Sequence, residues 1–363
     1  MSTIIMGIES SCDETSCAIV KDGREILSNT IYSQIDLHKE YGGVVPELAS
    51  RMHIEKISQV VDMALKEADV SLSQIDGISV TYGPGLVGAL LCGVSYAKSL
   101  SYALKKPLIK VHHIKGHIAG NYLTHKDLEP PFLCLVVSGG HSHIIEVKDY
   151  NSYNILAKTR DDAAGEAFDK IGRVLNLPYP AGSKIDKLSY EGDKDAISFP
   201  KVTFDNSFDF SFSGVKTAVI NYIHRISQKN PDFQKEDFTK VILKEKLNGN
   251  GVKQLKEEIT KADILASFTN AITSILCENT LKLATKYGYD KIVLAGGVAC
   301  NTHLRNKFLK EGKKNNIDVL YPLPVLCTDN AAMIASMGYY LYKDGQVADI
   351  NLNAVPYIDI ENS

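Results

Sequence analysis

The chain has 363 residues, of which 44% are hydrophobic and 23% are charged, and it contains no tryptophan. This composition is typical of a soluble globular protein, and the length is enough for two domains with separate cores. The formal net charge of −3 gives the whole molecule no electrostatic attraction to nucleic acid or to an anionic membrane. We therefore expect any contact with nucleic acid to use a local patch or a partner.

Cysteine usage and hydropathy bear on location. The seven cysteines are odd in number and form no C-x-x-C pair, which is typical of reduced thiols in a cytosolic protein. The first ten residues, MSTIIMGIES, lack a basic segment followed by a long apolar run, so we expect no signal peptide. The longest apolar stretches have strand length or are broken by glycine and polar residues, which argues against a membrane span. The sequence therefore predicts a cytoplasmic protein.

Two segments about 130 residues apart show the same order of predicted elements. Residues 4–33 read as an apolar strand, the polar turn SCDET and two further strands, and residues 131–160 read as a strand, a Ser/Gly turn and two strands. Helical sequence follows each segment, with Pro46 suited to the first turn of the first helix. We interpret this as a duplication of an α/β domain, the alternative being chance recurrence of short hairpins. Backbone N–H groups in two such turns can hold phosphate, which predicts a nucleotide between the domains.

Two later strand-to-helix junctions contain glycine. Residues 78–104 predict a strand, a turn at Gly83 and an apolar helix, and residues 291–312 predict a strand, the turn Gly296–Gly297 and a helix that Asn301 or Thr302 caps. Glycine permits close packing of a helix on a sheet, and it also lets a backbone approach an anionic ligand. We favour packing for the Gly83 junction. We favour nucleotide contact for Gly296–Gly297, because the amide of Asn301 lies beside the same turn.

Residues 111–117, VHHIKGH, place His113 and His117 on one face of a predicted helix. The spacing allows two metal ligands, and it also allows two ordinary surface histidines. The stretch is no zinc-protease motif, because Ile114 stands where that motif has its glutamate. A third ligand must come from another part of the chain.

Nine motifs, taken in chain order, carry a resemblance to a known family. They are GIESSCDET, YGGVVPELASR, YGPGLVGALLCG, HHIKGH, VSGGHS, DDAAGEAFDK, FSFSGVKT, AGGVACNTHLR and CTDNAAMIA. Together they closely resemble the tRNA N6-adenosine threonylcarbamoyltransferase family, formerly described as O-sialoglycoprotein endopeptidases, in its bacterial type. The resemblance extends from Gly7 to about Gly338.

The resemblance implies an α/β fold of the two-domain actin/hexokinase/Hsp70 type, with duplicated ββαβ-type cores and a helical insertion. We expect the first domain to comprise residues 1–129 together with about 330–363. The second domain is expected over 130–329, with a charged helical insertion at about 201–263.

The reaction that the resemblance implies is an acyl transfer. The threonylcarbamoyl group passes from threonylcarbamoyl-AMP to the exocyclic N6 amine of the adenosine just after the anticodon, in tRNAs that read ANN codons, and AMP is released. The alternatives are a small-molecule kinase and a non-enzymatic ATP-binding scaffold of the same fold. Neither alternative gives a reason for two histidines and an aspartate to form a metal site.

The resemblance also assigns residues to roles. The metal ligands are His113, His117 and Asp329, with Fe(II) as the expected ion and Zn(II) as the alternative. Lys115 replaces the glutamate that the family usually has between the histidines. The candidates for acid and base catalysis are Asp13 and Glu14, which could instead be exposed acids of a hairpin turn. The residues implied for binding the adenylate are Val136, Val137, Ser138, Gly139, Gly140, Asp169, Gly182, Asp186 and Asn301.

The expected partners follow from the same resemblance. They are tRNA, threonylcarbamoyl-AMP, a catalytically inactive paralogue and a small ATPase, with no membrane. A local group of cations could contact tRNA phosphates, or it could be an ordinary solvated helix face. Its members are Arg305, Lys307, Lys310, Lys313 and Lys314.

Overall fold

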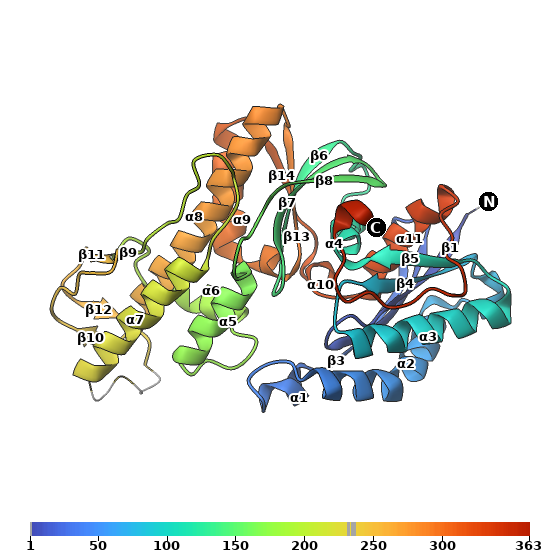
Figure 1. The fold of residues 1–363 in the computed structure, drawn as a ribbon, viewed down its shortest axis with the longest axis horizontal. Helices are drawn as coiled ribbons and strands as arrows, with labels where there is room; N and C mark the ends of the chain where they lie inside the picture. The colour runs from blue at the N-terminus through green and yellow to red at the C-terminus, as the bar shows by residue number, and fades with distance from the viewer. Residues whose placement is uncertain (1, 231–232, 234–236) are drawn as a thin grey trace.

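The computed structural model describes residues 2–230, 233 and 237–363, and Figure 1 shows the two lobes into which they fold. The sheet of the first lobe has the strand order β3-β2-β1-β4-β5. Its strands are β1 (Ile4–Glu9), β2 (Glu14–Lys21), β3 (Glu25–Ser33), β4 (Gly77–Gly83) and β5 (Leu108–His112). Strand β2 pairs antiparallel with both β1 and β3, whereas β1, β4 and β5 run parallel to one another.

The sheet of the second lobe repeats this arrangement, with the order β14-β13-β6-β7-β8. Its strands are β6 (Phe132–Val137), β7 (Ser142–Asp149), β8 (Ser152–Lys158), β13 (Lys291–Ala295) and β14 (Asp318–Leu320). The strands β6 to β8 are again antiparallel, and β6, β13 and β14 are parallel. The duplication predicted from the two hairpin segments is confirmed.

Helices cover both sheets. In the first lobe these are α1 (Ile35–Lys39), α2 (Pro46–Ala68), the 3-10 turn η1 (Leu72–Gln74), α3 (Val87–Leu104) and α4 (His113–Thr124). In the second lobe they are α5 (Ala164–Val174), α6 (Gly182–Leu188), η2 (Ser189–Glu191), α8 (Lys261–Tyr287), η4 (Gly297–Cys300) and α9 (Thr302–Lys314). Pro46 occupies the first turn of α2, and the Asn301 side chain caps α9, as predicted.

The last part of the chain returns to the first lobe. The short helix α10 (Pro324–Cys327) precedes α11 (Ala331–Lys343), and η5 (Ile360–Asn362) follows near the end. Helix α11 packs on β1, β2, β4 and α4, as Figure 1 shows at the right. The approach is close: a methyl group added at Gly7 would lie 2.3 Å from the carbonyl oxygen of Ala331. This return brings the residues before α11 next to α4.

The segment 201–263, where the sequence predicts a charged helical insertion, is only partly helical. It contains α7 (Ser213–Lys229) and the short strands β10 (Val241–Leu243), β11 (Lys253–Gln254) and β12 (Ile259–Thr260), with β9 (Ile197–Ser198) just before it. Helix α7 buries Val219, Tyr222 and Ile226 in the core of the second lobe, so its inner face is not a solvated surface. Residues 231–232 and 234–236 of this segment lie outside the described part.

Among the described residues, α3 is the one helix long and apolar enough to cross a membrane. It packs against β4 and α2 within the first lobe, so it is a helix of that domain.

Candidate metal centre and nucleotide turns

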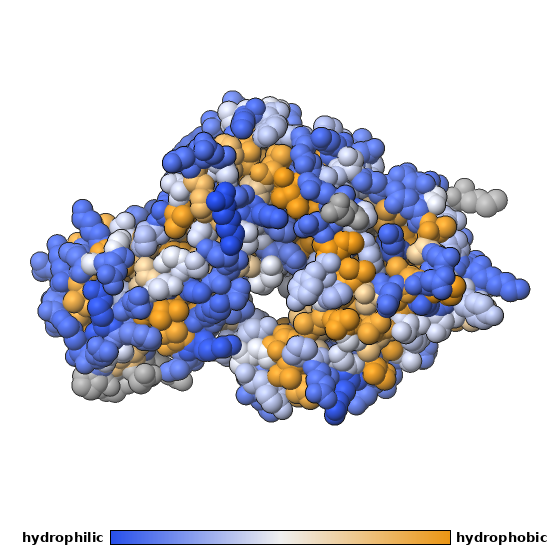
Figure 2. Space-filling model, viewed as in Figure 1, coloured by the Kyte–Doolittle hydropathy of each residue, from blue (hydrophilic) through white to orange (hydrophobic). Residues whose placement is uncertain are grey.

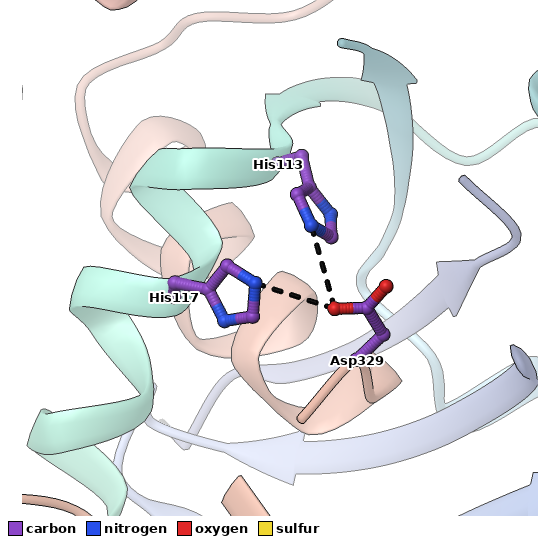
Figure 3. Close-up of side chains that lie close together, drawn as sticks. All are labelled: His113, His117 and Asp329. Carbon is purple, nitrogen blue, oxygen red and sulfur yellow. Dashed lines mark ion pairs between the residues drawn. The ribbon is translucent and has the colours of Figure 1, made fainter. Parts of the chain in front are cut away.

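His113 and His117 lie in the first turns of α4, directly after β5. The His112 side chain caps this helix by accepting a hydrogen bond from the Ile114 N–H at 3.1 Å. The helix points both imidazoles toward Asp329, which stands in the loop between α10 and α11 (Figure 3). Asn330 caps α11 and so fixes this loop.

The three side chains converge on one carboxylate oxygen. Oδ1 of Asp329 lies 3.5 Å from Nε2 of His113 and 3.3 Å from Nε2 of His117 (Figure 3). One potential ligand atom from each residue falls within 4.8 Å of the others. The sequence separation of more than two hundred residues is bridged because α11 packs beside α4.

This donor set fits a divalent metal ion. His117 is buried. Its Nδ1 has no hydrogen-bond partner among the described residues, and its Nε2 faces the Asp329 carboxylate at 3.3 Å without hydrogen-bond geometry. An unpartnered buried nitrogen costs free energy, which a metal bound at Nε2 would remove. Two imidazoles and one carboxylate suit Fe(II) or Zn(II), and they leave coordination positions for water or substrate.

Glu9, at the end of β1, orients His113 from the side opposite Asp329. Its Oε2 lies 3.1 Å from Nδ1 of His113 and accepts a hydrogen bond from Thr81 at 2.6 Å, while Oε1 accepts the Ser11 N–H at 2.5 Å. A carboxylate on Nδ1 directs Nε2 toward a metal. Sequence reasoning missed Glu9, because only the pairing of β1 with β4 brings it beside Thr81 and α4.

The ionisable groups of the centre shift one another's pKa values. Burial favours the neutral imidazole of His113, but the facing carboxylates of Asp329 and Glu9 dominate and raise its pKa well above the usual value. Burial likewise opposes ionisation of Asp329, yet the charge of His113 and the nearby imidazole of His117 hold its pKa below the usual range. In the absence of metal, His113 therefore carries a proton that a metal ion has to displace.

The predicted catalytic acids lie in the turn after β1, close to this centre. Asp13 is buried, with 8% of its surface exposed. Glu14 accepts a hydrogen bond from Ser33 at 3.1 Å. Burial raises the pKa of Glu14 to about 10, and the neighbouring carboxylates of Asp329 and Asp13 add to the shift. The turn is therefore not merely a pair of exposed acids, because Asp13 is buried and the surroundings favour the neutral form of Glu14 in the metal-free protein.

In the second lobe, two glycine-containing turns lie side by side because β6 pairs with β13. The sequence stretch VVSGG places Val136 and Val137 in β6 and the next three residues in the turn after it. A methyl group added at Gly296 would lie 2.4 Å from the Val137 carbonyl oxygen, so glycine is required there for close approach. Positions Gly139 and Gly140 instead face open space, which leaves room for a ligand.

The other predicted adenylate residues belong to neighbouring helix ends. Asp169 accepts the Ala181 N–H at 2.8 Å, next to Gly182, where a side chain would also meet open space. Asp186 accepts hydrogen bonds from the N–H and hydroxyl of Thr302 at 3.0 and 2.8 Å. The side-chain Oδ1 of Asn301 accepts the Leu304 N–H at 2.8 Å. These polar groups thus tie α5, α6 and α9 together, and their contact with substrate stays a prediction.

Lys115 does not point to solvent. It is 5% exposed, and its ammonium donates a hydrogen bond to the Ser363 carbonyl oxygen at 2.5 Å and lies 5.1 Å from the ring centre of Tyr153. Burial lowers its pKa to about 8, and Lys110 adds to the shift. His113 and His117 converge on Asp329 with Lys115 between them in the sequence.

A cavity of about 330 Å³ lies beside the centre, lined by His112, His141, His143 and the segment 357–360. Burial lowers the pKa of His141 to about 3, so its imidazole is neutral and can donate one hydrogen bond. Figure 2 shows an opening between the two lobes, and Arg173 of α5 spans the lobes by donating to the Gly42 carbonyl at 2.6 Å. The centre and the glycine turns therefore belong to one region between the lobes.

Known structures place the fold in a class. The chain is similar to HypF from T. kodakarensis, with a TM-score of 0.61 and 14% identity over 97% of this chain and 49% of that chain. It is also similar to (R)-2-hydroxyglutaryl-CoA dehydratase component A of Acidaminococcus fermentans, with a TM-score of 0.50 and 16% identity over 94% of this chain and 98% of that one. The molecule is thus a two-domain α/β protein of the actin/hexokinase type, with a His/His/Asp cluster between its lobes.

Sequence comparisons identify the family. The family model for tRNA N6-adenosine threonylcarbamoyltransferase matches residues 25–336. Proteins of that name from Clostridium novyi and Clostridium perfringens are 55% and 54% identical to this chain, over 98% and 97% of it and 97% of each relative. The chain belongs to the tRNA N6-adenosine threonylcarbamoyltransferase family.

Proposed function

We propose that the chain transfers the threonylcarbamoyl group of threonylcarbamoyl-AMP to N6 of the adenosine after the anticodon, in tRNAs that read ANN codons. The observation that carries the proposal is the convergence of His113, His117 and Asp329 beside the turn that holds Asp13 and Glu14. A kinase of this fold would use the phosphate-binding turns without needing this cluster. A non-enzymatic scaffold would have no need of it either.

The reaction forms a C–N bond and breaks the bond from the carbamoyl carbon to the phosphate oxygen. An aromatic amine is a weak nucleophile, so the reacting groups must be oriented and the carbonyl polarised. A divalent ion held by His113, His117 and Asp329 supplies Lewis-acid polarisation when it is bound. Asp13 is the proposed acceptor for the amine proton, and Glu14 is the proposed group that orients the carbonyl region.

The second lobe is proposed to hold the adenylate. The open space over Gly139, Gly140 and Gly182 gives room for a phosphate and a ribose. Asp169 and Asp186 each keep acceptor capacity beyond their helix-end hydrogen bonds, which suits ribose hydroxyls. The amide of Asn301 stands at the start of α9, whose N-terminus favours an anion. Val136, Val137 and Ser138 shape the strand end that carries this turn.

The proposed setting is the cytoplasm, in a complex with an inactive paralogue and a small ATPase. All seven cysteines are free in the structure. The cations after Asn301 support a need for partners in tRNA binding, because Arg305 and Lys307 turn inward to Ala299 and Asn270, and Lys314 pairs with Glu311. The proposed domain boundaries remain 1–129 with about 330–363, and 130–329.

The test incubates the purified protein with threonylcarbamoyl-AMP and an unmodified tRNA transcript, with and without the two proposed partners. Mass spectrometry of the digested tRNA then measures the modified nucleoside. A transcript with guanosine in place of the target adenosine is the matched control. We expect product only with the adenosine transcript. Absence of product under every condition, with folded and metal-loaded protein, would contradict the proposal.

A further inference from the structure

Two cysteines meet next to the metal centre, although neither is a candidate ligand. Cys300 ends η4 and precedes Asn301, and Cys327 ends α10, two residues before Asp329. Nη2 of Arg305 lies 3.4 Å from Sγ of Cys327 and 4.0 Å from Sγ of Cys300. Both sulfurs therefore lie against one guanidinium group, at the point where α10 packs on η4.

Their surroundings are fixed and asymmetric. Arg305 is held by the carbonyl oxygens of Ala299 at 2.5 Å and Pro322 at 3.2 Å, and its guanidinium lies 4.4 Å from the ring centre of Tyr321. Cys300 is half-buried, whereas Cys327 is fully buried. A small oxidant can therefore reach the sulfur of Cys300, whereas the sulfur of Cys327 is shielded from solvent.

The electrostatics favour Cys300 as the nucleophile. The hydrogen bond from Cys327 lowers the pKa of Cys300 to about 7, with Arg305 assisting against the effect of burial. The surroundings of Cys300 thus favour its thiolate, which is the reactive form of a cysteine. By contrast, burial raises the pKa of Cys92, which is also half-buried.

We propose that Cys300 and Cys327 form a redox-active dithiol that a hydroperoxide converts to a disulfide. The Cys300 thiolate attacks one oxygen of the peroxide, the O–O bond breaks, and the cysteine becomes a sulfenic acid while hydroxide leaves. The Cys327 sulfur then attacks the sulfenic sulfur, and the Cys327 proton leaves with the displaced hydroxyl as water. Two thiols lose two electrons in total, and the peroxide gains them.

The disulfide would act on the metal site. It would join the end of η4 to the end of α10, which draws Cys327 from its contacts with Arg305 and the Pro322 carbonyl. Asp329 follows two residues later and would shift relative to His113 and His117. Oxidation is therefore expected to weaken metal binding. The thiol chemistry itself does not depend on the proposed transfer reaction, whereas this coupling rests on the metal site.

The experiment treats the full-length protein with stoichiometric hydrogen peroxide after chelation of metal, so that iron chemistry does not intervene. Alkylation and peptide mass spectrometry then follow each cysteine. We expect a Cys300–Cys327 disulfide, reversible by a thiol reductant, with Cys92 still alkylated. Oxidation of Cys92 at a similar rate, or no disulfide, would overturn the proposal.

Variants separate the two steps. In Cys327→Ser, dimedone should trap a sulfenic acid at Cys300; in Cys300→Ser, neither disulfide nor adduct should form. Because Cys327 is buried, the Cys300→Ser result stands even where Cys327→Ser fails to fold. Titration with Zn²⁺ should show at least tenfold weaker binding by the oxidised wild-type protein, restored by reduction. Equal affinity in both states would overturn the coupling.

Discussion

The two lobes share one strand order, yet the turns after their first strands carry different side chains. In the first lobe a methyl group at Gly85 would lie 2.6 Å from the Ser11 carbonyl oxygen, and in the second lobe one at Gly296 would lie 2.4 Å from that of Val137. The backbones of the two strand ends are therefore packed alike. The side chains differ: the turn of the first lobe carries the acids Asp13 and Glu14, and that of the second lobe carries Gly139 and Gly140, which have no side chain.

This difference indicates that the two copies of the duplicated domain have separate roles, the first in the charged centre and the second in nucleotide binding. Glu9 of the first strand contacts His113, so the first lobe builds the charged centre from β1, α4 and the loop before α11. The second lobe leaves open space over its turn, which suits a phosphate contacted by backbone N–H groups. The comparison can be tested by altering each strand end separately.

The largest expected effect follows removal of a metal ligand. His113→Ala, His117→Ala and Asp329→Ala each leave two protein ligands, too few to hold the ion firmly. Transfer activity should fall by more than the roughly 10–100-fold that changes behind the ligands cause. The measurement is the rate of nucleoside formation, with the exposed His224→Ala as control. Wild-type rates in all three variants would show that the reaction does not require the cluster.

The next effect is expected from Glu9→Gln. The amide cannot accept from Ser11 and Thr81 and also receive the Nδ1 hydrogen of His113, so the imidazole loses its orientation. Metal affinity of the folded protein should fall about 10–100-fold. Titration with Zn²⁺ measures this, and a circular dichroism spectrum checks folding. A lower melting temperature with unchanged affinity would assign Glu9 a structural role only.

A change in the second lobe should affect the nucleotide and spare the metal. Gly139→Leu introduces a side chain into open space, so the fold should tolerate it while the path of the phosphate is blocked. AMP affinity by calorimetry should fall about tenfold or more, equivalent to at least ~1.4 kcal/mol. Gly214→Ala on α7 is the matched control. Equal AMP affinity in a folded Gly139→Leu protein would place the phosphate elsewhere.

The last prediction concerns stability instead of binding, and it is a gain for Glu14→Gln. The folded metal-free protein keeps Glu14 protonated because its pKa is about 10, whereas the unfolded chain ionises it above the ordinary value of 4.5. Folding then takes up a proton, so stability falls as pH rises from about 4.5 toward 10. The neutral glutamine removes this loss.

Melting curves at two pH values check the sign. At about pH 8 the metal-free variant should melt above the wild type, by roughly 2–4 °C for each kcal/mol regained. At about pH 4 the two proteins should melt together, because the wild-type carboxyl is protonated in both states. A gain of equal size at both pH values would point to packing instead of titration.

Periodicity and turn residues were sufficient to predict much of the fold. The paired hairpin segments predict the duplicated sheets, and the strand-turn-helix pattern at residues 291–312 predicts β13 and α9, including the cap at Asn301. Local sequence does not encode the short strands β10 to β12, because β10 forms by pairing with β12 and β11 by pairing with the distant β9.

The site was less accessible to local reasoning. Helical spacing brings His113 and His117 together, but only the resemblance points to Asp329, because tertiary packing of α11 joins segments more than two hundred residues apart. Glu9 carries no local signal, since it looks like the polar end of a buried strand. The partners of Lys115 likewise depend on where residues 353–363 cross the first lobe.

Anomalous X-ray diffraction from crystals grown with Zn²⁺ shows whether His113, His117 and Asp329 hold the ion. We expect one peak per molecule, about 2.0–2.2 Å from Nε2 of His113, Nε2 of His117 and an oxygen of Asp329. We also expect that His117→Ala crystals lose the peak. A peak coordinated by other residues, or a peak that persists unchanged in His117→Ala, would contradict the account.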